Sequence, residues 1–224
     1  MATGTVIYLH GFASGPTSGK ALYLQRQFTR LGIPFHIPDL NQGDFTHLTL
    51  TRQIHQIEGL LPPTPTVLIG SSFGGLTAAI LAEDHPQISH LILLAPAFGM
   101  NEYWRQKMTA DQLRQWQDQG VLWVYHYGEG KELPLHYEFL SDLERYKDRE
   151  FRRPVPTLII HGHQDEVVPI SVSETYARSR PWVHLVPVAD DHSLQGDLPR
   201  MWQEMAAFLG LPPSEPVAEE GSPK

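Results

Sequence analysis

Cysteine is absent from this chain of 224 residues, and its absence excludes several kinds of chemistry. Without a thiol there is no disulfide bond, no thiolate ligand for a metal ion and no cysteine nucleophile. Any covalent catalysis must therefore use another side chain. The lack of cysteine also fits a reducing compartment.

Basic residues are fewer than acidic ones: the chain has 17 Lys and Arg and 25 Asp and Glu, which gives a formal net charge of −8 at pH 7. Proteins that bind nucleic acid need a basic face for the phosphates, so this charge argues against a nucleic-acid partner. Long apolar runs are also missing, since the longest, near residues 91–97, is too short to cross a bilayer. We therefore expect no nucleic-acid partner and no membrane span.

The two ends of the sequence carry different signals. The first residues lack the basic segment of a secretory signal, and Val6–Leu9 already resemble a strand, so we expect a cytoplasmic protein. Residues 211–224 are rich in Pro, Glu, Ser and Gly, which cannot bury a core. The sequence thus predicts one domain over residues 1–210 and a disordered tail over residues 211–224.

Short apolar runs alternate with longer helix-compatible runs through most of the domain. This alternation predicts the α/β class, with a mostly parallel central sheet flanked by helices. The expected strands are residues 5–10, 34–37, 66–69, 90–94, 157–161 and 184–188, and the expected helices are residues 18–31, 46–61, 73–84, 171–179 and 198–209.

The alternation stops between Phe98 and Phe151, where half of the chain's 5 tryptophans, 8 tyrosines and 9 phenylalanines lie. We expect two or more helices here, forming a helical cap insert over residues 99–150 that covers a pocket. Trp104 and Trp123 would then line that pocket. The pattern fits equally well a structural excursion that only packs its own rings.

The sequence Gly70-x-Ser72-x-Gly74 lies where a predicted strand meets a predicted helix. A serine hydroxyl becomes a good nucleophile only beside a base, and it must stand clear of the backbone. A sharp strand-to-helix turn exposes it, and small residues two positions before and after relieve the crowding. Ser72 is therefore the candidate nucleophile. Ser71 does not fit, because the residue two positions before it is Ile69.

A nucleophilic serine needs a histidine base and an acid that orients it, and in this architecture they follow in the order Ser, Asp or Glu, His. Asp165 comes after the strand predicted at 157–161, and His192 after the one predicted at 184–188. The carboxyl ends of parallel strands share one edge, where open α/β sheets bind ligands. The alternatives are Glu166 as the acid, Asp165 as a plain helix cap and His192 as an ordinary surface histidine.

Backbone N–H groups should stabilise the oxyanion that forms during acyl transfer. One donor is expected from Phe73, the residue after the nucleophile. The other is expected in the loop after the first strand, where Phe12 is the first candidate and Ala13 the second.

Two other readings of the motifs fail. A phosphate-binding loop anchored on Gly19-Lys20 would need glycine at position 14 and serine or threonine at position 21, where the chain has Ser14 and Ala21. His161 and His163 lack the H-E-x-x-H pattern and a matching third ligand, so no metal site is expected.

The segments HGF at residues 10–12, GSSFGG at 70–75, HGHQD at 161–165 and DH at 191–192 resemble the α/β-hydrolase superfamily. The sequence from Ile7 to Ala21 and the GSSFGG segment resemble small bacterial YqiA-type esterases. The insert and the segment after it also resemble the branch of acyl-thioesterases and acyl-glucuronide esterases typified by a mammalian α/β-hydrolase domain-containing protein. The resemblance implies a triad of Ser72, Asp165 and His192, with Phe12 and Phe73 as oxyanion donors and no cofactor.

The predicted function is therefore hydrolysis of a small-molecule ester or thioester through an acyl-enzyme on a Ser-His-Asp triad. The same triad also serves C–C bond hydrolases and peptidases. A non-catalytic binding protein of the same fold is the remaining alternative, although such proteins usually lack a triad member and none is missing here.

Overall fold

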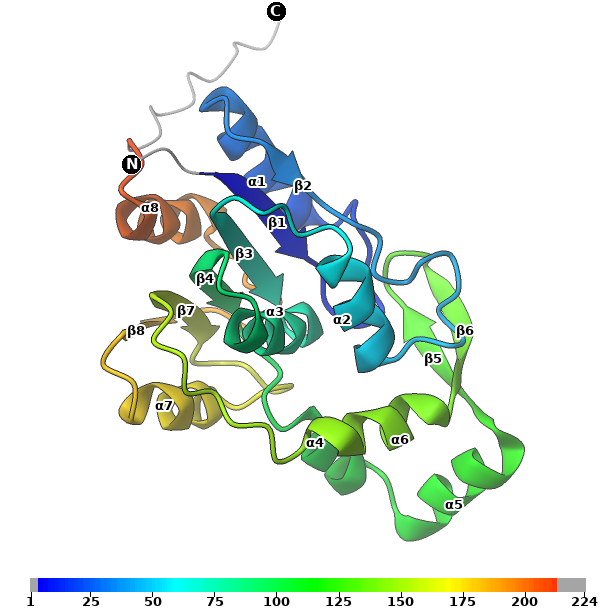
Figure 1. Ribbon diagram of the computed structural model, residues 1–224. Helices are drawn as coiled ribbons and strands as arrows, with labels where there is room; N and C mark the ends of the chain where they lie inside the picture. Colours follow the sequence, from blue (N-terminus) through cyan, green and yellow to red (C-terminus); the bar gives the residue numbers. More distant parts are fainter. Residues whose placement is uncertain (1–3, 213–224) are drawn as a thin grey trace, which may run out of the picture.

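The computed structural model describes residues 4–212, and its centre is a sheet of six parallel strands (Figure 1). Most of the tail predicted to be disordered, residues 213–224, lies outside the described residues. The strands lie in the order β2-β1-β3-β4-β7-β8. Their bounds are β1 (Thr5–Leu9), β2 (Phe35–His36), β3 (Thr66–Ser71), β4 (Ile88–Leu94), β7 (Thr157–Gly162) and β8 (Val183–Val188).

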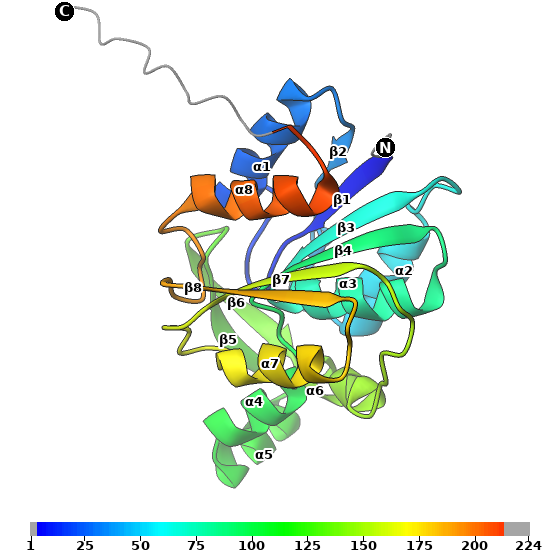
Figure 2. The same ribbon diagram turned by 90° about the vertical axis from the view of Figure 1, so that its left-hand side faces the viewer.

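Helices cover both faces of this sheet (Figure 2). On one face lie α1 (Gly19–Arg30) and α8 (Leu198–Leu209), and on the other α2 (Leu50–Glu58), α3 (Phe73–Asp84) and α7 (Ile170–Arg178). Successive strand side chains point to opposite faces, so each inner strand supplies both layers. On β3, for example, Val67 and Ile69 pack with α1 and α8, whereas Leu68 packs with α3. The predicted fold class is confirmed.

The insert between β4 and β7 contains helices, as expected, and also a hairpin that the sequence analysis did not predict. Its helical elements are α4 (Met100–Lys107), α5 (Ala110–Gln119), α6 (Glu138–Leu143) and the short 3₁₀ helix η1 (Glu144–Tyr146). Between them β5 (Val121–His126) and β6 (Lys131–His136) pair antiparallel. A run of β-branched and aromatic residues that ends in a glycine-containing turn is typical of such a hairpin.

The topology places the candidate site. The strand order reverses at β1, because β2 is added on one side of β1 and β3 is added on the other side. The loops after β1 and β3 therefore lead to α1 and α3 on opposite faces of the sheet. Such a switch point is where open α/β sheets bind ligands. No helix within residues 4–212 has the length and apolar character needed to cross a membrane.

Candidate active site

Ser72 occupies the sharp turn between β3 and α3, with φ 51° and ψ −114°. This is a backbone conformation that residues with a side chain rarely adopt, so surrounding contacts must hold it. Those contacts come from β4 and the segment after it, because the Ser72 N–H donates to Leu94 O (2.8 Å) and the Ser72 carbonyl accepts from Ala97 N (3.0 Å). Ser72 is partly exposed, whereas Ser71 is buried.

Steric crowding explains why Gly70 and Gly74, the residues two positions before and after Ser72, are glycines. A Cβ atom on Gly70 would lie 2.4 Å from the carbonyl oxygen of Gly74, and one on Gly74 would lie 2.2 Å from the carbonyl oxygen of Leu9. Both contacts are with backbone atoms that cannot move aside independently. The elbow therefore requires glycine at both positions and brings α3 directly against β1.

Three side chains meet above this elbow. His192 Nε2 lies 3.0 Å from Ser72 Oγ, and His192 Nδ1 lies 2.7 Å from Asp165 Oδ2. They come from the loops that follow β8, β3 and β7, as the sequence order predicted. Because a carboxylate only accepts hydrogen bonds, Nδ1 carries the proton and Nε2 is left to accept one from the serine hydroxyl.

Asp165 is buried and fully hydrogen-bonded. Its Oδ1 accepts from the N–H groups of Val167 (2.9 Å) and Val168 (2.8 Å), and its Oδ2 lies 3.1 Å from His161 Nε2 as well as near His192. Burial alone would raise the pKa of Asp165, but the hydrogen bonds from His161, His192 and Val168 outweigh it and hold the pKa well below its usual range. The carboxylate is therefore ionised at neutral pH.

Asp165, rather than the neighbouring acid Glu166, contacts the histidine. Glu166 is exposed and makes no hydrogen bond within the described residues. The two N–H groups of Val167 and Val168 show that Asp165 also caps its own loop, so the plain capping interpretation describes only one of its oxygens.

His161 supports the acid. Its side chain is buried, and its Nε2 lies between Val168 O (2.8 Å) and Asp165 Oδ2, both of which only accept hydrogen bonds, so Nε2 carries a proton. Its Nδ1 lies 2.8 Å from Ser173 Oγ on α7. His161 therefore joins the Asp165 loop to α7, a role that its place in the sequence did not reveal. Within residues 4–212 no cluster of three or more His, Asp or Glu residues could hold a metal ion.

The loop after β1 lies against the elbow. A Cβ atom on Gly11 would lie 3.4 Å from Ser71 O and 3.5 Å from Ser72 Cβ, so a side chain here would be in van der Waals contact with the elbow. The next residue, Phe12, packs its ring edge-on to that of Phe73 at 6.4 Å. Within the described residues neither Phe12 nor Phe73 uses its backbone N–H in a hydrogen bond. Neither predicted donor is therefore engaged by another group in this part of the chain.

His10 fixes this loop, and the sequence analysis assigned it no role. The ring is buried; its Nε2 accepts from Leu40 N (3.0 Å), so its Nδ1 carries the proton and donates to Gly11 O (3.0 Å). Ala13, the second candidate donor, has φ 52°. Its carbonyl accepts a hydrogen bond from Gly128 N (3.4 Å) at the tip of the β5–β6 hairpin.

The insert borders the site on the Phe12 side. The Phe12 ring lies 5.7 Å from that of Trp104 on α4 and 5.2 Å from that of Phe139 on α6. Trp123, by contrast, is 62% exposed on the outer face of the hairpin.

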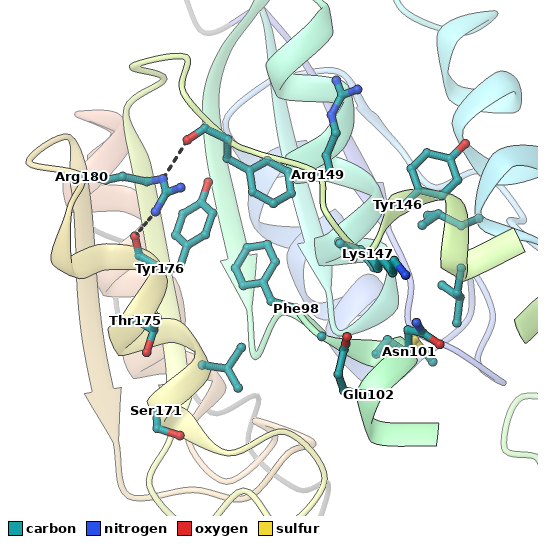
Figure 3. A pocket seen from close by; sticks show the side chains of 17 residues that line it. Phe98, Asn101, Glu102, Tyr146, Lys147, Arg149, Ser171, Thr175, Tyr176 and Arg180 are labelled. Atoms are coloured by element: carbon teal, nitrogen blue, oxygen red, sulfur yellow. Dashed lines mark hydrogen bonds between the residues drawn. The ribbon is translucent and has the colours of Figure 1, made fainter. Parts of the chain in front are cut away.

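A separate cavity of about 510 Å³ lies where α3, α4, η1 and α7 approach one another (Figure 3). One wall consists of the rings of Phe98, Phe151 and Tyr176. The guanidinium of Arg180 donates hydrogen bonds to the backbone carbonyls of Phe151 and Tyr176. Ser72, Asp165 and His192 do not line it. The candidate site at the elbow is therefore separate from this cavity.

Comparisons with known proteins agree with the fold. Residues 5–210 match the family described as "Uncharacterised protein family (UPF0227)". No curated protein matches the sequence at a significant level. Among solved structures, the mouse α/β-hydrolase domain-containing protein 10 is 20% identical, with a TM-score of 0.77 and coverage of 92% of this chain and 89% of that one.

Two bacterial structures are similar to the same extent. A putative hydrolase from Agrobacterium vitis is 23% identical, with a TM-score of 0.80 and coverage of 92% of this chain and 88% of its own. Est1E from Butyrivibrio proteoclasticus, with ferulic acid bound, is 21% identical, with a TM-score of 0.77 and the same coverages. These likenesses establish the α/β-hydrolase fold that the sequence resemblance implied.

Proposed function

We propose that this chain, which belongs to the uncharacterised protein family UPF0227, hydrolyses carboxylic esters or thioesters through an acyl-enzyme formed on Ser72. The single observation that carries the proposal is the hydrogen-bonded chain from Ser72 Oγ through His192 to Asp165, with separations of 3.0 and 2.7 Å. A serine, a histidine and a buried ionised carboxylate in this order form the arrangement that activates a serine for acyl transfer.

In the first half of the reaction, Ser72 Oγ attacks the substrate carbonyl carbon while His192 Nε2 takes the hydroxyl proton. Asp165 holds the imidazole with its proton on Nδ1 and stabilises the positive ring that forms. The negative charge that develops on the carbonyl oxygen is stabilised by the backbone N–H groups of Phe12 and Phe73. The imidazolium then gives its proton to the leaving alcohol or thiol, and the acyl-enzyme remains.

In the second half, a water molecule takes the place of the leaving group. His192 Nε2 removes a proton from the water as its oxygen attacks the acyl carbon, and the proton then passes to Ser72 Oγ as the acid leaves. The sequence of steps needs only these side chains, two backbone N–H groups and water.

Two features favour esters and thioesters over the other reactions of the same triad. The sequence resembles esterases and thioesterases, and one structural neighbour, Est1E, has ferulic acid bound, which is a carboxylic acid like the product of ester hydrolysis. Other neighbours named for ester chemistry are a monoacylglycerol lipase from Paleococcus ferrophilus and polyneuridine aldehyde esterase.

We also propose that residues 99–150 act as a cap beside this site. The support is the contact of Trp104 and Phe139 with Phe12, together with the bond from Gly128 to Ala13. Each of these contacts joins the insert to the loop that supplies a proposed oxyanion donor.

The experiment is a matched panel of p-nitrophenyl esters, acyl thioesters, p-nitroanilide peptides and a C–C hydrolase substrate, measured with native protein and with Ser72→Ala. The proposal predicts turnover of esters or thioesters that disappears in the variant. If only the peptides or only the C–C substrate were turned over, the proposed ester or thioester class would be wrong. Turnover that survives in Ser72→Ala would reject the mechanism.

A further inference from the structure

Lys20 is a buried lysine that the reaction above does not use. It lies in the first turn of α1, and its ammonium donates a hydrogen bond to the backbone carbonyl of Ser193, the residue directly after His192. Lysine is rarely buried, because removing its charge from water costs free energy that only specific partners offset. A buried ammonium beside the general base therefore calls for a function.

The loop that carries His192 has little regular structure of its own. It is held by its own carboxylates: Asp190 accepts from Asp191 N (2.8 Å) and Gly196 N (2.9 Å), and Asp191 accepts from Ser193 N (2.8 Å). These bonds shape the loop but do not attach it to the rest of the protein.

Apart from the hydrogen bonds of the His192 ring and the buried side chain of Leu194, two hydrogen bonds attach the backbone of this loop to other segments. At its start, Gln164 N donates to Asp190 O (3.0 Å), which joins it to the Asp165 loop. At the residue after His192, the attachment is Lys20. Within residues 4–212, Lys20 is the one side chain from outside residues 190–196 that donates a hydrogen bond to a backbone carbonyl of this loop. The first turn of α1 follows the loop closely, since a Cβ on Gly19 would lie 2.8 Å from Gln195 Oε1.

We infer that Lys20 is a positioning residue, whose ammonium fixes the backbone beside His192 to α1 and thereby keeps His192 Nε2 within hydrogen-bond distance of Ser72 Oγ. The inference rests on the proposed function, because it assigns Lys20 a part in presenting the base. It also explains the lysine of the segment HGFASGPTSGKA, which does not form a phosphate-binding loop.

The charges around Lys20 are consistent with this role. Burial lowers the pKa of Lys20 to about 8, and the carboxylates of Asp190, Asp191 and Asp165 act in the opposite direction. Lys20 is therefore mainly protonated at pH 7, and its bond to Ser193 O is a charge-assisted one, about twice as strong as a neutral bond. A methionine at position 20 would keep most of the volume and lose both the charge and the donor.

The test compares Lys20→Met with a control on the same helix. Gln27 is also a buried polar residue of α1, and Gln27→Met removes a polar group from the helix without touching the His192 loop. Melting temperature, kcat and KM are measured for both variants, together with the rate at which a small fluorophosphonate labels Ser72. The downfield proton resonance of the His192 Nδ1–H, hydrogen-bonded to Asp165, is followed by NMR.

Misplacing a catalytic group by about 1 Å costs on the order of 100-fold in rate. We expect Lys20→Met to lower kcat and the labelling rate by about 10-fold to 100-fold, with KM within about twofold of native, and to broaden or shift the His192 resonance. Gln27→Met should keep native kcat, labelling and resonance even if its melting temperature falls as far. Lys20→Arg, which restores a charged donor, should recover part of the lost rate.

Three outcomes would overturn the inference: native kcat and labelling in Lys20→Met, an equal loss of both in Gln27→Met at an equal melting temperature, or an unchanged His192 resonance in Lys20→Met. Failure of the proposed function looks different. In that case the fluorophosphonate does not label Ser72 in the native protein at all.

Discussion

The carbonyl oxygen of Leu9 lies where a side chain on Gly74 would have to go, because a Cβ atom there would be only 2.2 Å away. Strand β1 and the first turn of α3 are thus in backbone contact directly beneath Ser72. The turn that exposes the serine and the packing of the sheet depend on each other at this point.

Gly74→Ala should therefore destabilise the protein, since extra atoms in a packed interior typically cost about 1–3 kcal/mol. The elbow should also shift, so catalytic activity should fall further than the loss of folded protein explains. Gly15→Ala is the matched control, because a Cβ on Gly15 meets no atom within 4 Å. Urea unfolding measures both variants, and equal stability of the two would show that the crowding at Gly74 is relieved without cost.

The lowered pKa of Asp165 predicts how stability depends on pH. A carboxyl whose pKa is depressed by folding contributes stability above the ordinary aspartate pKa of about 3.9, and that contribution is lost as pH falls toward the folded value. Asp165→Asn removes the charge at every pH. The stability difference between native protein and Asp165→Asn should therefore be greatest near neutral pH and shrink on acidification. A difference that stays constant between pH 6 and pH 3 would contradict the lowered pKa.

The same substitution should affect catalysis through the tautomer of His192. With an amide at position 165 the imidazole loses its orienting acceptor, and kcat should fall by about 10⁴-fold, as in other Ser-His-Asp hydrolases. Initial rates at saturating ester measure this effect. A fall of less than about tenfold would remove Asp165 from the proposed triad.

The pH dependence of activity should identify the base. His192 must be neutral to accept a proton, so kcat/KM should rise as the pH is raised from acidic to neutral. A flat pH profile, or near-native activity in His192→Ala, would assign the base elsewhere.

The insert gives a prediction about substrate choice that Trp104 and Trp123 can test together. Both were expected to line a pocket, but only Trp104 packs on Phe12, whereas Trp123 is exposed on the hairpin. If the insert holds the acyl group, each buried CH₂ adds up to about 0.8 kcal/mol to binding. Trp104→Ala should then change the preferred ester chain length, and Trp123→Ala should leave it unchanged. Equal effects of Trp104→Ala on acetate and on longer esters would leave the insert a structural role only.

The sequence predicted the parts of this protein that depend on local rules. The elbow was predictable because Gly70, Ser72 and Gly74 lie within one turn, and their sizes alone indicate a strained corner. Asp165 and His192 were predictable in position because parallel strands end at one edge, so any residue directly after a strand reaches that edge. The six central strands were predicted to within a few residues for a different reason, which is that strands buried on both faces have nearly continuous apolar runs.

The features that the sequence did not reveal depend on contacts between distant segments. The roles of His10, His161 and Lys20 follow from loops that meet only in the folded chain, and no spacing along the sequence records those meetings. The β5–β6 hairpin was not predicted, although its β-branched and aromatic run is a local strand signal, because it lies between helices in a segment that was expected to contain helices only. The exposure of Trp123 follows from that hairpin, since alternate residues of a strand face opposite sides.

Covalent labelling of Ser72 by a fluorophosphonate, followed by peptide mass mapping, tests the central claim most directly. Ser71 and Ser72 are neighbours, but Ser71 is buried and only Ser72 is hydrogen-bonded to His192. Ser71 is therefore an internal control for the labelling. The account predicts one label per chain, on Ser72 alone. It also predicts that Ser72→Ala remains folded, is not labelled and loses turnover by a factor on the order of 10⁴–10⁶. Labelling of Ser71, labelling of no serine, or turnover retained in Ser72→Ala would contradict the account.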